Sequence, residues 1–271
     1  MATASNTTNI LINQELSIQI SLNGLSFCIL HPDTNTIAYL KHFNFSQKQT
    51  PFQVLDELKK IFNTTQALQS NFNALNVVYI NELSTLVPKP LFNENAIADY
   101  LKFNSKILQT DYIAQDVIVI NNSVNVYVPY MNINNYLYDK FGSFAYKHFS
   151  TILVEEILLK EKHAQDKKMY VHVNNNHFEI IVTNQGNLDL YNTFTFTTKE
   201  DFIYYILFTA EQLQLNPETL KLVFLGNIVA ENELYNIAFK YIRHIAFGTP
   251  NTNYIVDQET KHSNYILKHS F

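Results

Sequence analysis

LSIQISLNGLSFCILHPDTNTIAYLKHFNF, which covers residues 16–45, aligns without a gap with KKMYVHVNNNHFEIIVTNQGNLDLYNTFTF, which covers residues 167–196, at a constant offset of about 151. In both stretches apolar and polar residues alternate over three short runs, and this period of two is typical of half-buried strands. The apolar residues that align are Ile18 and Met169, Ile20 and Val171, Leu22 and Val173, Phe27 and Phe178, Ile29 and Ile180, Leu30 and Ile181, Ile37 and Leu188, Phe43 and Phe194, and Phe45 and Phe196. The alignment predicts an internal duplication, with a three-stranded antiparallel meander in each copy.

Turn-forming residues separate the predicted strands. Asn23-Gly24 is a strong signal for a two-residue hairpin in the first copy. Residues 174–176, three asparagines, take the same place in the second copy, because Asn adopts left-handed backbone more readily than most residues. The second turns are residues 32–35 and 184–186. Chance recurrence in a chain rich in Phe and Asn is the alternative, and the agreement of the turns disfavours it.

A helix is predicted after each meander, and both helices begin with a capping signal. Thr50-Pro51-Phe52-Gln53 is a capping box with Pro at the first helical position. Thr197, followed three residues later by Glu200, predicts a second capping box. A short strand and a further helix follow in each copy: residues 76–80 and 94–103 in the first, and 221–225 and 231–241 in the second.

The segment between the repeats predicts two strands, 116–120 and 124–130, and two helices, 133–141 and 151–162. The lysine-rich residues 160–168 then mark a boundary. We therefore expect a flexible tail over residues 1–13, a first half over residues 14–165 that contains the central segment, and a second half over residues 166–271.

The element order resembles that of a known fold. Three antiparallel strands followed by alternating helices and strands is the order of the ribonuclease-H-like fold, and two such units with a cleft between them resemble the actin-like ATPase superfamily. The chain as a whole resembles an uncharacterised bacterial family of unknown function with that fold, over roughly residues 14–250. The expected class is α/β with mixed sheets and two halves, each βββαβα. The fold alone does not decide the function.

The resemblance implies where ATP would bind, and those positions have changed. Superfamily members hold phosphates on two hairpin turns that usually carry Asp-x-Gly and a small polar residue. The first turn here keeps Gly24 and Ser26 without that Asp, and the second, residues 174–177, has neither Asp nor Gly. The adenosine motif usually has paired glycines, of which Gly226 remains, followed by Asn227. These four residues are the candidate nucleotide-binding residues, and no catalytic residue is assigned.

Composition limits the partners. The formal net charge of −5 gives no electrostatic reason to expect nucleic acid or an anionic membrane. Arg243 is the sole arginine, and five glycines are few for a fold that closes loops around nucleotide. Residues 1–13 show no basic segment followed by an apolar run, so a signal peptide is not expected. Apolar stretches such as residues 202–210 are about half the ~20 residues that a membrane span needs. We expect a cytoplasmic protein.

Other chemical candidates have plainer explanations. His172 and His177 flank the Asn run and are interpreted as exposed hairpin residues, and His262 and His269 as surface or tail residues, so no metal site is expected. Cys28, the only cysteine, is expected to be a buried thiol in a reducing compartment. A Ser-His-Asp triad stays open on composition, although no Gly-x-Ser-x-Gly motif occurs.

Five tyrosines crowd the central segment: Tyr127, Tyr130, Tyr136, Tyr138 and Tyr146. Core and rim packing is the plainer interpretation. An exposed Tyr-rich patch would suit a protein partner, which makes residues 133–150 the first candidate contact surface.

Three functions remain. The first is a non-catalytic actin-like protein, or pseudo-enzyme, that acts through contacts with protein partners and needs no cofactor. The second is an ATPase or kinase-like switch that binds ATP and Mg²⁺ with altered loops, and the third is an RNA-associated factor. An enzyme predicts carboxylates that converge on a cleft with space for ATP. A scaffold predicts a cleft filled by side chains, or lined by Asn without carboxylates.

Overall fold

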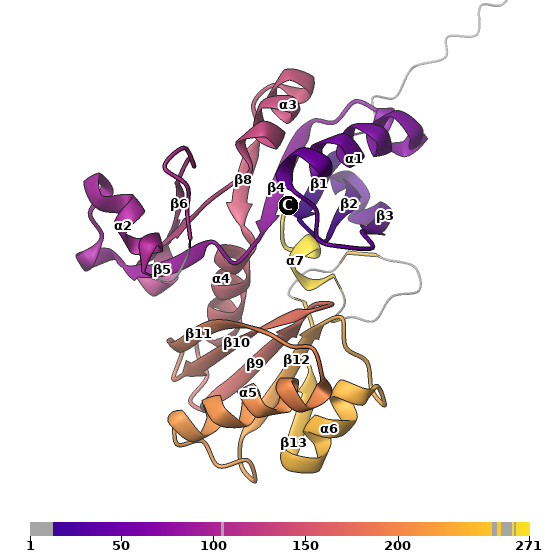
Figure 1. The fold of residues 1–271 in the computed structure, drawn as a ribbon. Coiled ribbons are helices and arrows are strands. Elements are labelled where there is room, and N and C mark those ends of the chain that lie inside the picture. The colour runs from indigo at the N-terminus through magenta and orange to yellow at the C-terminus, as the bar shows by residue number, and fades with distance from the viewer. Residues whose placement is uncertain (1–12, 104–105, 251–253, 256–261, 263) are drawn as a thin grey trace, which may run out of the picture.

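The computed structural model describes residues 13–103, 106–250, 254–255, 262 and 264–271. These residues form two five-stranded mixed sheets, one above the other, and a smaller three-stranded sheet beside them (Figure 1). The mixed α/β class with two ribonuclease-H-like halves is thereby confirmed. The tail expected over residues 1–13 lies outside the described residues except for Asn13.

The first half has the order βββαβαβα, interrupted by an insert. Its elements are β1 (Glu15–Ser21), β2 (Gly24–His31), β3 (Thr36–Asn44), α1 (Pro51–Thr64), β4 (Ala74–Ile80), α3 (Met131–Phe141), β8 (Ala145–His148) and α4 (Phe149–Glu161). The insert lies between β4 and α3 and consists of β5 (Ser84–Pro88), α2 (Ile97–Lys102), β6 (Ala114–Ile118) and β7 (Ser123–Tyr127), with short 3-10 turns between them.

The second half repeats the order without an insert. Its elements are β9 (Lys168–Val173), β10 (His177–Asn184), β11 (Asn187–Thr195), α5 (Lys199–Gln212), β12 (Lys221–Gly226), α6 (Glu233–Tyr241), β13 (His244–Phe247) and α7 (Tyr265–Lys268). The sheet orders, β3-β2-β1-β4-β8 and β11-β10-β9-β12-β13, match position by position. Each half thus extends the predicted βββαβα by one strand and one helix. The counterpart of α6 is α3, whereas the sequence assigned that place to residues 94–103, which contain α2 of the insert.

The strand pairing corrects the alignment of the two copies. Ile18 pairs with Phe27 in the β1–β2 hairpin, and Val171 pairs with Ile180 in the β9–β10 hairpin, so these pairs correspond at an offset of 153. The offset returns to 151 in the third strand, because the turn before it is two residues shorter in the second half. Since side chains alternate with a period of two, an error of two residues left every residue on its predicted face.

Capping residues begin the two amphipathic helices as the sequence implies, with one correction. Thr50 caps α1, and the Gln53 side chain accepts a hydrogen bond from the Thr50 backbone N–H as predicted. The second box uses Thr198 and Asp201 rather than Thr197 and Glu200. The helix therefore begins one residue later than predicted.

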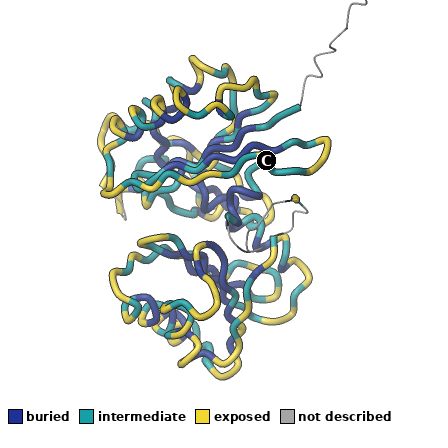
Figure 2. The backbone as a smooth tube through the Cα atoms, turned by 90° about the vertical axis from the view of Figure 1, so that its right-hand side faces the viewer, coloured by how far each residue is buried: buried dark blue, intermediate teal, exposed yellow. Residues whose placement is uncertain are grey.

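Three buried apolar layers form the core, one in each half and one between the halves. Helices α1 and α3 cover one face of the first sheet, and α5 and α6 cover one face of the second, each over its own apolar cluster. Helix α4 is apolar on nearly all sides and packs with α7 between the two sheets, as expected of a buried helix. Dark, buried backbone accordingly runs through both halves and through the layer between them (Figure 2).

Candidate functional site

A cavity of about 210 Å³ lies between the two halves, where their first hairpin turns face each other. Gly24, Ser26, Gly226 and Asn227, the four candidate nucleotide-binding residues, all line it. The fold therefore brings together positions that are about 200 residues apart in the sequence. Its volume lies below the ~300–1,000 Å³ of usual ligand pockets.

The lining of this cleft is polar but carries no formal charge. It contains seven asparagines, one glutamine, three histidines and two serines: Asn23, Asn44, Asn174, Asn175, Asn176, Asn227, Asn264, Gln19, His42, His172, His177, Ser21 and Ser26. Phe149 and Tyr265 supply aromatic surface. No Asp, Glu, Lys or Arg is found among the described residues that line it. Of the two sequence-based expectations, the lining of Asn without carboxylates is the one observed.

Both glycines of the cleft are required by backbone packing. A Cβ at Gly24 would lie 2.7 Å from the Phe43 carbonyl oxygen, and a Cβ at Gly226 would overlap the Val173 carbonyl oxygen. Gly226 also has a positive φ of 80°, which L-residues rarely adopt. The first turn itself consists of Leu22 and Asn23, since Gly24 already pairs with Ser21, so the predicted Asn23-Gly24 turn is one residue too late. These glycines therefore have a structural role whether or not a ligand binds.

Side-chain amides bridge the cleft. The Asn175 amide nitrogen donates to Asn44 Oδ1 at 3.5 Å, which joins the second-half turn to the end of β3. The Asn227 amide nitrogen donates to Asn175 Oδ1 at 3.3 Å. The three amides form a ladder across the mouth, and sequence reasoning missed it because the contact depends on how the halves pack.

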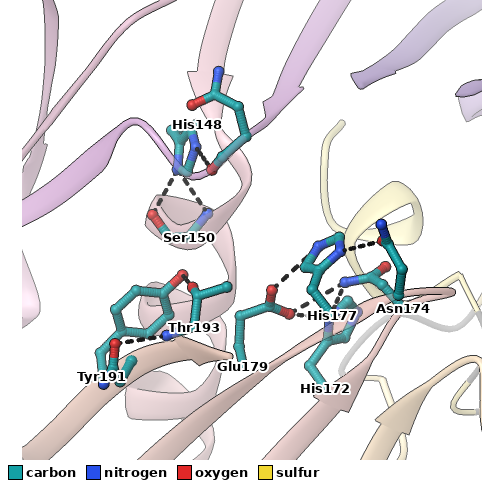
Figure 3. A network of polar contacts seen from close by, with 11 residues as sticks. His148, Ser150, His172, Asn174, His177, Glu179, Tyr191 and Thr193 are labelled. Atoms are coloured by element: carbon teal, nitrogen blue, oxygen red, sulfur yellow. Dashed lines mark hydrogen bonds and ion pairs between the residues drawn. The ribbon is translucent and has the colours of Figure 1, made fainter. Parts of the chain in front are cut away.

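A buried carboxylate supports the wall of the cleft (Figure 3). Glu179 Oε2 lies 2.8 Å from His172 Nδ1 and accepts a bond from the Asn174 amide at 3.2 Å. His177 Nε2 lies 3.4 Å from the other oxygen, Oε1. Glu179 is fully buried and His172 is 6% exposed, so the interpretation of His172 as a solvent-exposed residue was wrong. The signal was available, because His172 and Glu179 face each other across the β9–β10 hairpin.

The C-terminal histidines are also buried, contrary to expectation. His262 stacks on Phe247 with ring centroids 4.4 Å apart. His269 lies 3.3 Å from Glu156, and burial lowers the pKa of its imidazole. Within the described part of the chain, no three His, Cys, Asp or Glu residues are grouped to hold a metal ion. Cys28 is buried in β2 as predicted.

A second, larger cavity of about 670 Å³ lies beside the cleft. Its wall is mainly apolar and comes from the β1–β2 turn, the start of α1, the insert and the link from β7 to α3, and the second half adds residues of the β9–β10 turn and β11. Phe52, Leu108 and Tyr112 line it while 73%, 65% and 51% exposed. The hairpin turns form the partition between the two cavities, which share six lining residues: Ser21, Asn23, Ile80, Phe149, Asn176 and His177. Nothing in the sequence patterns identified this cavity, because the repeat has no copy of the insert.

A buried polar network fixes the insert to α4. Asp116 Oδ2 accepts bonds from the His148 backbone at 3.0 Å and from the Thr151 hydroxyl at 2.7 Å, and Oδ1 accepts from the Tyr127 hydroxyl at 3.1 Å. Burial raises the pKa of the Asp116 carboxyl and lowers that of the His148 imidazole to about 3. Strands β6 and β7 of the insert are therefore bonded to the start of α4.

The tyrosine-rich segment divides between core and surface. Tyr127 and Tyr130 are buried, Tyr136 and Tyr146 are partly buried, and Tyr138 is 63% exposed. Core and rim packing therefore accounts for most of them. The exposed apolar side chains around the larger cavity lie outside residues 133–150.

The two matching five-stranded sheets, with their hairpin turns facing each other, have the arrangement of the actin-like ATPase fold. A crystal structure from Bacteroides thetaiotaomicron, described as a protein with actin-like ATPase fold and unknown function, superposes with a TM-score of 0.79 at 22% identity and covers 95% of each chain. A chain of the PilM-PilN type IV pilus biogenesis complex superposes with a TM-score of 0.62 at 9% identity, over 96% of this chain and 98% of that chain.

Within this class, the chain belongs to the family described as protein of unknown function (DUF3822), whose model matches residues 3–245. A comparison with curated proteins gives no match. None of the helices in the described residues combines the length and apolar character that a membrane crossing requires.

Proposed function

We propose that this chain is a non-catalytic protein of actin-like fold that binds a protein partner, and that the larger cavity is the docking site. The observation that carries the proposal is the contrast between the two cavities. The cleft at the phosphate turns has about 210 Å³ and, among the described residues that line it, no carboxylate to hold a metal ion, whereas its neighbour has about 670 Å³ and a mainly apolar wall.

A nucleotide finds few of the groups it needs in the cleft. Binding of ATP usually depends on Lys or Arg and a metal ion to balance the phosphate charges. The described lining offers amides and imidazoles instead.

The larger cavity has the features of a binding site for a protein segment. Phe52 and Tyr112 expose aromatic surface at its edge, and aromatic residues are enriched in interface cores. Polar groups such as Lys48 and Asp111 are also available to fix orientation. Participation of the same fold in the PilM-PilN complex supports a role in protein binding.

The test is capture of the partner by the full-length chain and by two matched variants. Phe52→Arg places a charge in the cavity, whereas Phe103→Arg changes a side chain that is 89% exposed and does not line it. We expect a partner that is retained by the wild type and Phe103→Arg and lost with Phe52→Arg. Equal retention by both variants would exclude the cavity as the docking site.

The alternative, a nucleotide-binding switch with altered loops, rests on Gly24, Ser26, Gly226 and Asn227, which line one cleft. Thermal unfolding with and without millimolar Mg-ATP separates it from the first proposal. A ligand at 100 times its dissociation constant stabilises the native state by about 2.7 kcal/mol. We expect no shift in Tm. An ATP-dependent rise would favour the switch and would call for hydrolysis assays.

Two further assignments belong to this proposal. We place the functional halves at residues 14–165 and 166–271, with the insert as part of the first. A cytoplasmic location agrees with the single buried Cys28, since the chain uses no disulfide bond.

A further inference from the structure

We infer that the cleft between the halves binds a small uncharged molecule that carries several hydroxyl groups on a ring, of the size of a monosaccharide. This goes beyond the proposed protein contacts, which use the neighbouring cavity. The inference rests on the lining of the cleft, on its volume, and on the way in which its polar side chains are held.

The lining matches hydroxyl groups better than ions. An Asn or Gln side chain offers two donors and two acceptor lone pairs, so it bonds equally well to a group that both donates and accepts, as a hydroxyl does. Seven asparagines and Gln19 line the cleft. An ionised ligand would have to be desolvated without a countercharge among the described lining residues, which is costly. The lining therefore selects against charged ligands.

The amide ladder orients these groups in advance. Each ladder bond uses one donor and one acceptor, so Asn44, Asn175 and Asn227 retain further bonding capacity toward the cleft. Amides that are already held in place lose less conformational freedom when a ligand arrives. A ligand that offers fewer hydroxyls would leave them unpaired, which gives selectivity.

Glu179 determines how His172 faces the ligand. Glu179 Oε2 lies 2.8 Å from His172 Nδ1, which fixes the ring so that the other nitrogen, Nε2, points away from the carboxylate. Nε2 lies beside Gly226, where a Cβ would come within 3.2 Å of it. His172 and Gly226 both line the cleft, so a ligand hydroxyl would meet the imidazole on its Gly226 side, and Glu179 acts as a positioning residue rather than as a contact.

The rest of the lining suits a ring. Phe149 and Tyr265 line the cavity while only 2% and 1% exposed, so they close its inner side with apolar edges against which the C–H groups of a ring can pack while the amides bond its hydroxyls. The volume of about 210 Å³ admits a ligand smaller than the drug-sized molecules of typical pockets.

Isothermal titration of the full-length protein tests the inference. The probes are a panel of uncharged monosaccharides and inositol, each with its phosphate ester, and ATP. We expect saturable binding of at least one uncharged probe at one site per chain, at least tenfold tighter than its phosphate ester. Absence of saturable binding for every uncharged probe, or tighter binding of an ester or ATP, would overturn the inference.

Two variants locate the site. Asn175→Leu removes the central amide of the ladder at an exposed position and is expected to weaken binding of the same probe at least tenfold. Asn63→Leu changes an exposed asparagine of α1 outside the cleft and should leave it unchanged. Glu179→Gln keeps the side-chain shape, removes the charge that orders His172, and should weaken binding with normal folding by circular dichroism. An equal loss with Asn63→Leu would contradict the assignment.

Discussion

The two halves share a core and differ on the surfaces that face each other. Six core positions of the first two strands correspond at one offset: Leu16, Ile18, Ile20, Leu25, Phe27 and Ile29 in the first half, and Met169, Val171, Val173, Phe178, Ile180 and Val182 in the second. On the opposite face of the sheets, Ser26 of the first half corresponds to the buried Glu179 of the second. Packing has preserved apolar character at shared positions, while the facing surfaces have diverged.

The insert is the larger asymmetry. In the second half the chain passes from β12 to α6 directly, whereas in the first it builds a three-stranded sheet between β4 and α3. That sheet provides one wall of the 670 Å³ cavity. The duplicated frame therefore supplies the two apolar cores, and the insert adds a wall to a cavity that the duplicated β1–β2 turn and α1 also line.

The largest expected effect tests whether the halves are one cooperative unit. Phe178→Ala removes a fully buried ring that packs on Phe194, Phe196 and Phe202, and should lower the free energy of unfolding by about 3–5 kcal/mol. Leu25→Ala, at the corresponding position, should cost about 2–5 kcal/mol. Because α4 packs against both sheets, each variant should unfold in urea in a single transition at a lower midpoint. Two separated transitions would show that the halves fold independently.

A smaller effect is tied to pH and to the first half alone. The buried His148 has a pKa of about 3, because burial disfavours its charged form, against an ordinary value near 6.5. Between about pH 6.5 and pH 3, the unfolded chain therefore binds a proton at His148 that the native state does not bind. The contribution of His148 to the free energy of unfolding is present above about pH 6.5 and is lost as the pH falls toward 3. Between pH 7 and pH 5 the loss is about 2 kcal/mol at about 1.4 kcal/mol per pKa unit.

His148→Gln should remove this part of the pH dependence, measured as the difference in unfolding free energy between pH 7 and pH 5. The corresponding position of the second half is Thr249, which does not titrate, and Thr249→Gln serves as the control. If His148→Gln keeps the wild-type pH dependence, His148 is not the residue responsible.

The sequence predicted the parts of the fold that repeat. The alternation of apolar and polar residues assigned the strand faces correctly. The alignment of the two copies was wrong by two residues in the first two strands, but a shift of two residues keeps each side chain on the same face. Strands β8 and β13 were missed, since four residues at the end of a sheet carry too little periodicity to detect. The helix that corresponds to α6 was taken to be residues 94–103, whereas the predicted helix 133–141, which is α3, fills that place, because the insert interrupts the repeat.

The candidate site was only half predictable. Gly24, Ser26, Gly226 and Asn227 were expected from the family resemblance, and they line one cleft. The Glu179 contact could have been found from the hairpin register, which pairs it with His172. The contact between Asn44 and Asn175 depends on the packing of two halves more than a hundred residues apart, and no local pattern carries that information.

The smallest expected effect concerns the two helix caps. Thr50→Ala and Thr198→Ala each remove a hydroxyl that accepts a backbone bond at the start of α1 or α5, and each should cost about 1 kcal/mol in urea unfolding at neutral pH. A cost below the error of measurement at either position would show that the reciprocal bond, from the cap residue's backbone N–H to Gln53 or Asp201, suffices.

The caps should differ in their response to acid. Hydrogen bonds from the Thr198 and Thr197 backbone lower the pKa of the Asp201 carboxyl. The stabilisation that Asp201 gives is therefore present above the ordinary pKa of an Asp carboxyl and is lost as the pH falls through the lowered pKa. Gln53, its counterpart in α1, does not titrate. The destabilisation caused by Asp201→Asn should therefore shrink on acidification while that of Gln53→Ala stays constant. Parallel behaviour of the two variants would mean that the second cap does not depend on the charge.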